Sequence, residues 1–495
     1  MKHLWSILNK HKLLILILLI SLFFRTYKIV DRFEYAHDGD LTSWFVKDVV
    51  VNHHPRLIGQ LTSAPGIFIG PLYYYLVIPF YLLTKMDPIG ALIPITLFGV
   101  FTTFSYFWVF KKLWNKNAGF FAAFLQSILY SWVYFDRRVV PSTPTNLWTI
   151  WYFYCVLALA RGNFKILWLL GLLVGLIWHI HIALLPALAA IPIAVIVSKK
   201  LPSKKQLSHF IFAFLISNLP LLLFEARHNF SQSKSLVANF LTNHGSGLGG
   251  VEKLQHVVNM IAGNLERLFF FPHSFPGNRL ALLVGAVILG VLLVHKRVLQ
   301  KRDLLLLFTW ALAVILFFGL SSSPLSEYYF YNIEVISVCF FVLALCFTWE
   351  KGILGKGTTL LLLGVLFFNN ANYLVTQYYY QKGYNERKAV AKYIAEDSRQ
   401  KGFSCVSVSY ITSIGEDVGF RYFFYLNSLH VNKPISGSPV YSIVQPTHLA
   451  QGQNEAHFGQ IKVIPPEKVG TKEEIEKSCM GENSNLTDPM FGFTN

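Results

Sequence analysis

Residues 13–24 read LLILILLISLFF, an uncharged run that can be extended to Val30. Roughly 20 residues of helix cross the hydrocarbon core of a bilayer, so this run has about the length of a membrane span. Lys10 and Lys12 precede it, as basic residues precede a signal peptide, but the continuation FFRTYK offers no small-residue cleavage site. The run is therefore predicted to be a retained membrane anchor.

Hydrophobic runs of this kind recur along the chain. Hydrophobic residues make up 54% of the 495 residues and charged residues only 14%, which is more apolar than a soluble core of this length requires. The sequence therefore predicts an α-helical polytopic membrane protein. The further runs are 66–84, 88–110, 118–135, 144–160, 166–198, 210–224, 280–294, 304–320, 335–349 and 357–375.

Lys/Arg clusters between the runs predict the orientation, because such clusters favour the cytoplasmic side of a membrane. Placing every cluster inside, together with the N-terminus, requires an even number of crossings between neighbouring clusters. Three runs lie between Lys12 and Lys111, so one of them does not cross. We assign this role to 66–84, GIFIGPLYYYLVIPFYLLT, as a juxtamembrane or re-entrant element interrupted by two prolines.

The same parity requires the run 166–198 to cross twice. As one helix its 33 residues would be about 50 Å long, against a core of about 30 Å, and the turn is expected near His179–Pro186. Eleven crossings result, and the protein is expected in the plasma (inner) membrane. The segments predicted on the outer face are 31–65, 136–143, 225–279, 321–334 and everything after 376.

The composition becomes mixed near the C-terminus. KAVAKYIAEDSRQ (388–400) has the pattern of an amphipathic helix, while SCVSVSY (404–410) and PVYSIV (439–444) have the pattern of strands. We therefore predict a membrane domain over 1–375 and a small extracytoplasmic α/β domain over 376–495. Cys405 and Cys479 lie in the second domain and can pair if the compartment is oxidising.

The first outer connection carries the acidic stretch EYAHDGDLTSWF (34–45). Asp38 and Asp40 are separated only by Gly39, just beyond the first span. Asp-Gly is also a common turn dipeptide, so a solvated turn is the alternative to a functional role.

Cations also occur in the outer segments, against the topological bias. Arg137 and Arg138 lie in FDRRVVPSTP (135–144), and Arg227 and His228 lie in LLFEARHNFSQSK (222–234). A guanidinium fork fits two phosphate oxygens, which makes these residues candidates for binding a phosphate. The alternative is that they reach the lipid headgroups, which is the reading we favour for Lys234.

The order of several motifs resembles the GT-C superfamily of membrane glycosyltransferases, and most of all the branch similar to protein O-mannosyltransferases and the lipid A aminoarabinose transferase. The resemblance extends over most of the predicted membrane domain. It rests on DGDLTSW, GPLYYYLVIPF, FDRRVVP, GLIWHIHIALLP, FEARHNF and EYYF, in this order.

This resemblance implies a polyprenyl-phosphate-linked sugar donor and a glycan, lipid or protein acceptor on the outer face. It also implies a catalytic acid in the first outer loop, where Asp38 stands. Many members follow that acid directly with Glu or Gln, whereas this chain has Gly39 and then Asp40. Which carboxylate has which role therefore stays open.

The chemistry of such a transfer fits the residue types. Inverting transfer needs a carboxylate to accept the proton of the acceptor hydroxyl, and Asp38 is the expected general base. Positive charge must stabilise the phosphate that leaves, which is the expected role of the arginines. Two carboxylates can hold a divalent metal ion or act without one, so the cofactor is not determined.

Further polar and aromatic residues of the outer segments are candidates for an acceptor or sugar pocket. His179 and His181 are two residues apart, so their side chains point in different directions on a helix and could bind one metal ion only if the turn were unwound. A pocket contact or an interfacial position is therefore favoured. The tyrosines also suit an interfacial aromatic belt, which is their alternative role. The pocket candidates are Tyr74, His179, His181, Glu225, Glu327 and Tyr328.

A polytopic transporter or a lipid-linked sugar flippase is the alternative function. Such proteins keep ionisable residues near mid-membrane and often have internal repeats. Here the spans are almost free of charge and the acids gather on one side, which favours the transferase. Nucleic acid is not expected as a partner, because the basic residues lie in the inner loops.

Overall fold

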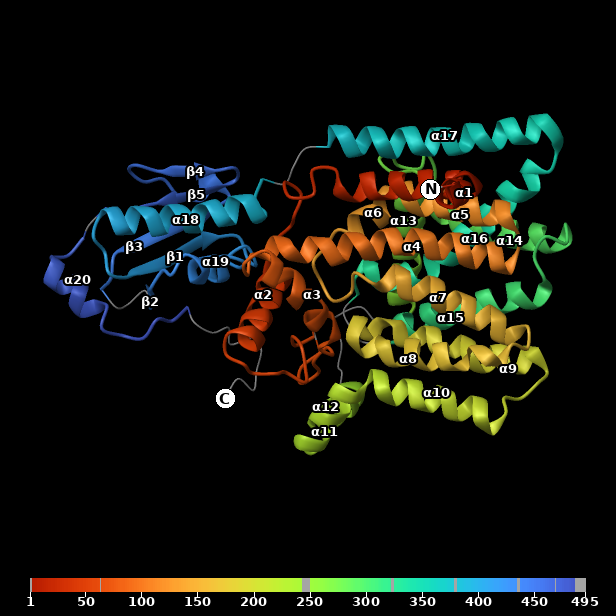
Figure 1. Cartoon of the computed structure of the whole chain (residues 1–495), viewed down its shortest axis with the longest axis horizontal. Helices are drawn as coiled ribbons and strands as arrows, with labels where there is room; N and C mark the ends of the chain where they lie inside the picture. The colour runs from red at the N-terminus through yellow and green to blue at the C-terminus, as the bar shows by residue number, and fades with distance from the viewer. Residues whose placement is uncertain are drawn as a thin grey trace.

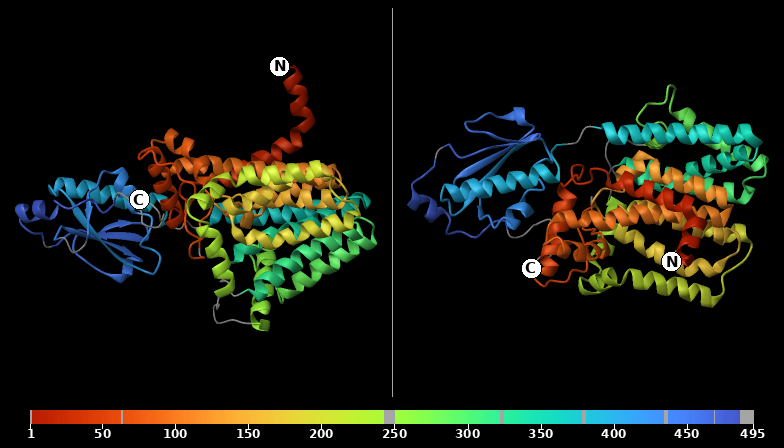
Figure 2. Two further views of the ribbon diagram at one scale, coloured as in Figure 1. Left: turned by 90° about the horizontal axis from the view of Figure 1, so that it is seen from below. Right: turned by 45° about the horizontal axis from the view of Figure 1, so that its top comes forward.

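The chain forms a helical bundle with an α/β domain at one end (Figure 1). The computed structural model describes residues 2–62, 64–242, 250–321, 325–377, 381–433, 437–467 and 469–485. Helices α2 (His37–Val50) and α3 (Leu72–Leu83) lie between the bundle and the α/β domain. Figure 2 shows the same arrangement from two other directions.

The bundle is built from apolar helices joined by short connections. Many of them are broken, as where α5 ends at Ile128 and α6 begins at Tyr130. The helices are η1 (Pro88–Ala91), α1 (Lys2–Thr26), α4 (Leu92–Leu113), α5 (Lys116–Ile128), α6 (Tyr130–Phe135), α7 (Thr145–Ala160), η2 (Phe164–Ile166), α8 (Leu167–Ile180), η3 (Ile182–Ala189), α9 (Ala190–Ser198), α10 (Lys204–Ser217), α11 (Leu219–Arg227), α12 (Ser231–Thr242), α13 (Gly250–Phe269), α14 (Leu280–His295), α15 (Lys301–Leu320), η4 (Glu327–Phe330), α16 (Tyr331–Trp349) and α17 (Gly352–Thr376).

Four helices of the described residues are long and apolar enough to cross a membrane, and a fifth if α10 and α11, bent by 66°, are one span. The four are η1 with α4, α15, η4 with α16, and α17. Five shorter apolar helices have 10–17 residues each, so the eleven crossings stay a prediction. Among them, α3 is about 18 Å long and does not reach across a core of about 30 Å.

The segment 166–198 reverses direction, as the parity of the basic clusters predicts. Gly162 precedes α8 and packs against the side chain of Lys200, which follows α9, so the two ends of the segment meet. The reversal lies at His181, where α8 gives way to the 3-10 helix η3. The predicted turn is therefore found within His179–Pro186.

Helix α13 lies in the segment 225–279, which the sequence analysis treats only as a polar outer connection. Its apolar face packs against α15 and α16. Val257, Ile261 and Leu268 belong to the core of the bundle. The charged residues on its other face hide this helix from a search for uncharged runs.

The C-terminal domain contains a five-stranded mixed sheet with the order β2-β1-β3-β5-β4. Strand β1 pairs in parallel with β2 and with β3, where Ser409 stands opposite Ser442, while β5 is antiparallel to β3 and β4. The predicted helix and both predicted strands are present. The elements are α18 (Tyr384–Gln400), β1 (Val406–Thr412), α19 (Arg421–Leu426), β2 (Val431–Asn432), β3 (Val440–Gln445), β4 (Ala456–Phe458), β5 (Ile461–Ile464) and α20 (Lys472–Ser478).

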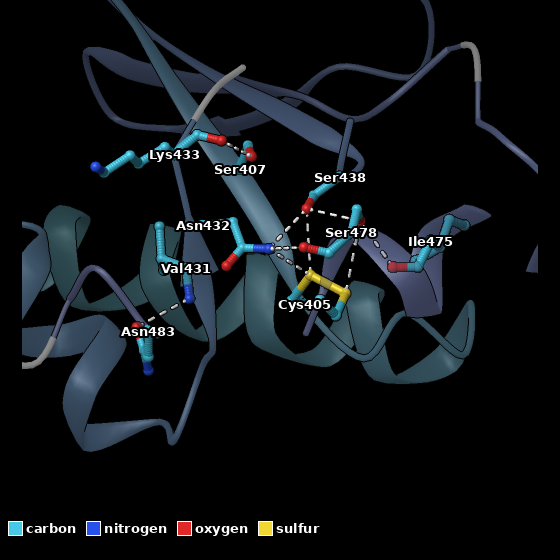
Figure 3. The surroundings of a disulfide bond; sticks show 10 residues. Cys405, Ser407, Val431, Asn432, Lys433, Ser438, Ile475, Ser478 and Asn483 are labelled. Atoms are coloured by element: carbon cyan, nitrogen blue, oxygen red, sulfur yellow. Dashed lines mark hydrogen bonds between the residues drawn. A yellow bond between two sulfur atoms is a disulfide. The ribbon is translucent and has the colours of Figure 1, made fainter. Parts of the chain in front are cut away.

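A disulfide joins Cys405 and Cys479, as the sequence analysis allows for an oxidising compartment (Figure 3). It ties the start of β1 to the end of α20 across 74 residues of sequence. The amide of Asn432 donates to the hydroxyl of Ser438 beside it, at 3.0 Å. The free cysteines of the described residues are Cys155, Cys339 and Cys346, all buried.

One hydrophobic core is shared by the C-terminal domain and the two helices α2 and α3. Phe45 and Tyr74 belong to it from α2 and α3, and Phe423 and Tyr441 from the C-terminal domain. The C-terminal domain is therefore packed onto α2 and α3, and not only linked to the bundle through the end of α17.

Candidate functional site

The acidic stretch that follows the first helix is itself helical. α2 begins at His37, so Asp38 and Asp40 lie in its first turn, where the helix dipole favours negative charge. A Cβ atom on Gly39 would lie 2.9 Å from the ring of Tyr35, so the glycine allows this ring to pack on the helix. The alternative of a solvated Asp-Gly turn is therefore wrong.

Asp38 is held by a side chain from the loop before α3. The amide of Gln60 donates to Oδ1 of Asp38 at 2.8 Å. The hydroxyl of Tyr74 in turn donates to Oε1 of Gln60 at 2.9 Å. Within the described ranges, Oδ2 of the half-buried Asp38 has no hydrogen-bond partner, so one carboxylate oxygen is oriented while the other is open.

Aromatic side chains lie near this carboxylate. The charge of Asp38 acts on the hydroxyls of Tyr73, Tyr74 and Tyr328. The hydroxyl of Tyr73 is buried and has no hydrogen-bond partner among the described residues. The ring of His181 stands edge-on to Tyr328, with the centroids 5.3 Å apart. Of the predicted pocket residues, Tyr74 and Tyr328 are thus near Asp38, and His181 packs on Tyr328.

Asp40 faces the C-terminal domain instead. The backbone N–H of Tyr422, at the start of α19, donates to Oδ1 of Asp40 at 3.3 Å. The hydroxyl of Tyr35 donates to the same oxygen, also at 3.3 Å. Asp40 is buried, with 5% of its surface exposed. The structure therefore separates the two carboxylates that the sequence places side by side.

The two neighbouring arginines also have different surroundings. The guanidinium of Arg137 donates to the backbone carbonyls of Phe24 and Tyr27 at the end of α1, at 2.6 and 3.0 Å. Burial lowers the pKa of Arg137 to about 10. These carbonyls are the ones that a helix leaves unpaired at its C-terminus, so Arg137 caps α1.

Arg138 is half-buried and makes no side-chain hydrogen bond or ion pair within the described residues. Its charge and that of Arg267 on α13 both act on the hydroxyl of Tyr331. The next residue, Val139, packs in the core shared with α2 and α3. Arg138 and Arg267 are therefore both near Tyr331, as are the acidic side chains of Glu327 and Glu334. The motifs do not place Arg267 there, because they do not show that 250–269 is a helix.

Of the five remaining predicted site residues, three have partners of their own and two are exposed. Both ring nitrogens of His179 are used, since Nδ1 accepts from the N–H of Leu72 and Nε2 lies 2.9 Å from the carbonyl of Ser217. Glu225 accepts from two backbone N–H groups at the start of α12, at 3.0 Å each. His228 stacks on Phe224, while Arg227 and Glu327 are exposed.

Three buried ionisable groups, Arg25, Asp136 and Glu334, were not predicted from the sequence, although the spans are expected to be almost free of charge. Arg25 in α1 forms an ion pair with Asp136 at 2.6 Å, and both side chains are at most 3% exposed. Glu334 in α16 accepts from the indole of Trp132 at 2.5 Å. Arg25 follows directly on the uncharged run 13–24, and this position was the feature of the sequence that could have identified it.

The structure gives no support to a metal held between the two carboxylates. Asp38 and Asp40 bond to different elements, and His179 has both nitrogens occupied. No group of three or more His, Cys, Asp or Glu side chains within the described ranges is arranged to hold a metal ion.

Comparison with known proteins identifies the fold. No protein-family model and no curated protein matches the sequence. ArnT from Cupriavidus metallidurans bound to undecaprenyl phosphate matches with a TM-score of 0.56 at 10% identity, over 93% of this chain and 100% of that one. The same protein in the apo state matches with a TM-score of 0.56 at 11% identity, over 93% and 97%.

The Archaeoglobus fulgidus oligosaccharyltransferase in complex with Zn and sulfate gives a lower TM-score of 0.48 at 14% identity, over 88% of this chain and 68% of that one. The chain therefore has the fold of ArnT.

Proposed function

We propose that the protein transfers a sugar from a polyprenyl-phosphate donor to an acceptor hydroxyl on the outer face of the plasma membrane. One observation carries this proposal. The short segment Glu327–Tyr331 has Tyr328 in the field of Asp38 and Tyr331 in the field of Arg138 and Arg267. An acid and two arginines are thus near the two ends of one short segment, which fits a base beside a group that stabilises the leaving phosphate.

On the acid side, Asp38 is the general base. The acceptor oxygen attacks the anomeric carbon while its proton passes to the open Oδ2 of Asp38. Gln60 keeps the other oxygen fixed, so the carboxylate is oriented before the acceptor arrives. The rings of Tyr73, Tyr328 and His181 provide the flat surfaces on which a sugar can stack.

On the cationic side, Arg138 and Arg267 hold the donor phosphate. The bond from the anomeric carbon to the phosphate oxygen breaks, and polyprenyl phosphate leaves with the electron pair. Arg138 has no competing partner among the described residues, in contrast to Arg137, which already caps α1. The ArnT structure of the same fold holds undecaprenyl phosphate, which supports a lipid phosphate as the donor.

The transfer is proposed to invert the anomeric centre. Retention through a covalent intermediate requires a second carboxylate close to the first, about 5 Å away in retaining glycosidases. Asp40 is directed to the C-terminal domain and does not fill this role. The acceptor can be a glycan, a lipid or a protein.

Turnover of defined donors tests the proposal. Purified protein in nanodiscs is incubated with a panel of undecaprenyl-phosphate monosaccharides and with glycolipid, glycan or protein acceptors. We expect acceptor-dependent loss of one donor and release of undecaprenyl phosphate, and an inverted anomeric configuration in the product by NMR. Absence of turnover with every donor, together with solute transport in liposomes, would favour the transporter instead.

A further inference from the structure

We propose that Asp40 is a positioning residue through which the C-terminal domain fixes the rotation of α2 and so the place of Asp38. The inference rests on the proposed function, because it assigns to Asp38 the catalytic role given above. It also assigns a task to the C-terminal domain, which contributes no side chain that contacts Asp38 through a hydrogen bond within the described residues.

Asp40 lies where three elements meet. Its Oδ1 accepts from the backbone N–H of Tyr422 in α19 and from the hydroxyl of Tyr35. The same Tyr35 hydroxyl lies 2.9 Å from the hydroxyl of Ser43 in α2, which lies 3.0 Å from the hydroxyl of Tyr81 in α3. The contacts of Asp40 therefore connect α2, α3 and the C-terminal domain through one buried polar network.

Ring contacts extend this connection along α2. Trp44 packs edge-on to Tyr422 at 5.6 Å and against Tyr425 at 5.7 Å between ring centroids. The guanidinium of Arg421 lies over the Trp44 ring, 5.9 Å from its centroid. Asp40 and Trp44 are four residues apart, so they lie on the same face of the helix. This whole face is covered by α19.

The geometry of a helix explains why this face matters for the reaction. Each residue turns the helix by about 100°, so Asp38 and Asp40 diverge by about 200°. If the C-terminal domain holds the Asp40 face, α2 cannot rotate and Asp38 stays aligned with Gln60. A misplacement of about 1 Å in a reacting group costs on the order of 10²-fold in rate, so a small rotation would be sufficient to slow transfer.

Three variants of the full-length protein test the inference. Asp40→Leu removes the acceptor of the Tyr422 N–H, whereas Asp40→Asn keeps an oxygen in the same place. The matched control is Asp87→Asn. Asp87 also binds the C-terminal domain, through the hydroxyl of Tyr384 at 2.6 Å and Lys388 at 2.5 Å, but it lies at η1 and not on α2. Tyr35→Phe is the alternative variant should Asp40→Leu fail to fold.

Two measurements are made on each variant. Hydrogen exchange of residues 37–50 reports the stability of α2 and does not depend on any reaction. Steady-state kinetics with the undecaprenyl-phosphate sugar that the parent protein turns over separate kcat from the donor KM. We expect faster exchange of α2 in Asp40→Leu and a loss of kcat of about 10- to 100-fold with little change in KM. Asp40→Asn and Asp87→Asn should stay near the parent in both measurements.

Exchange of α2 at the parent rate in Asp40→Leu would overturn the inference, whatever the activity. Faster exchange with unchanged kcat would overturn it as well, because the position of Asp38 would then not depend on Asp40. An equal loss of kcat in Asp87→Asn would show that docking of the C-terminal domain in general, and not the Asp40 contact, is responsible. A parent protein without turnover would contradict the proposed function, while the exchange data would still show whether Asp40 stabilises α2.

Discussion

Asp38 and Asp40 lie two residues apart on α2 and hydrogen-bond to opposite sides of it. Asp38 accepts from Gln60, which precedes α3, and Asp40 accepts from Tyr422 in the C-terminal domain. The two carboxylates therefore do not form a pair that shares a proton or a metal ion. In the proposed mechanism, Asp38 accepts the proton and Asp40 holds the helix that carries Asp38.

The first prediction concerns the general base. Asp38→Asn keeps an oxygen that accepts from Gln60 but cannot take a proton, so transfer should fall by about 10²–10⁴-fold. Sugar transfer from the undecaprenyl-phosphate donor measures this loss. Binding of undecaprenyl phosphate and the unfolding temperature should stay close to those of the parent, because no cation that would hold the phosphate is changed. A folded Asp38→Asn protein with the parent rate would remove Asp38 from the mechanism.

The second prediction separates the neighbouring arginines. Arg138→Ala should weaken binding of undecaprenyl phosphate and lower kcat/KM, since it removes a free guanidinium from the proposed phosphate site. Arg138→Lys should restore only part of the loss, because an ammonium lacks the bidentate fork. Isothermal titration with undecaprenyl phosphate and steady-state kinetics measure both effects.

Arg137→Ala is the matched control for this site. It should lower the unfolding temperature more than Arg138→Ala does, because it leaves buried carbonyls at the end of α1 without a donor. Full donor affinity in Arg138→Ala would exclude it from the phosphate site. A stable Arg137→Ala protein that fails to bind the donor would show that Arg137 binds the phosphate.

The sequence predicts the fold class well but places side chains only in part. Uncharged runs and basic clusters locate the apolar segments and the reversal at His181, because hydrophobicity and charge act locally. They do not locate α13, whose charged face breaks the uncharged run. They also cannot tell that 66–84 begins with an irregular segment and holds a helix of only 12 residues.

In the candidate site, the sequence identifies single residues but not the residues that they contact. Asp38, Arg138 and Tyr328 are recognisable from their motifs, but Gln60 and Arg267 belong to no motif, and Arg267 lies on a helix that the sequence did not predict. Nothing in the order DGD distinguishes an acid that faces the site from one that faces another domain. Only the helical register and the packing of α19 on α2 separate Asp38 from Asp40.

The third prediction concerns the buried ion pair. Arg25→Met should destabilise the protein by about 3–5 kcal/mol, because Asp136 would stay buried without its partner. The double variant Arg25→Met/Asp136→Leu should recover much of this loss, since it leaves neither charge alone. Thermal unfolding in detergent compares the two. A double variant that is less stable than Arg25→Met would contradict this account of the pair.

The last prediction joins the disulfide to the site. Cys479→Ser opens the link between β1 and α20, which closes a long loop of the C-terminal domain, and such a loss typically costs about 2–5 kcal/mol. If α19 of this domain holds α2 in place, as we propose, the loosened domain should also lower kcat, and reducing agent should produce the same two effects in the parent protein. Cys155→Ser is the control, since Cys155 is a free buried cysteine in α7 and its loss opens no disulfide. Unfolding temperature and sugar transfer, each with and without reductant, measure the effects. Lower stability of the C-terminal domain with unchanged sugar transfer would show that transfer does not depend on this domain, and would contradict the proposal that it positions α2.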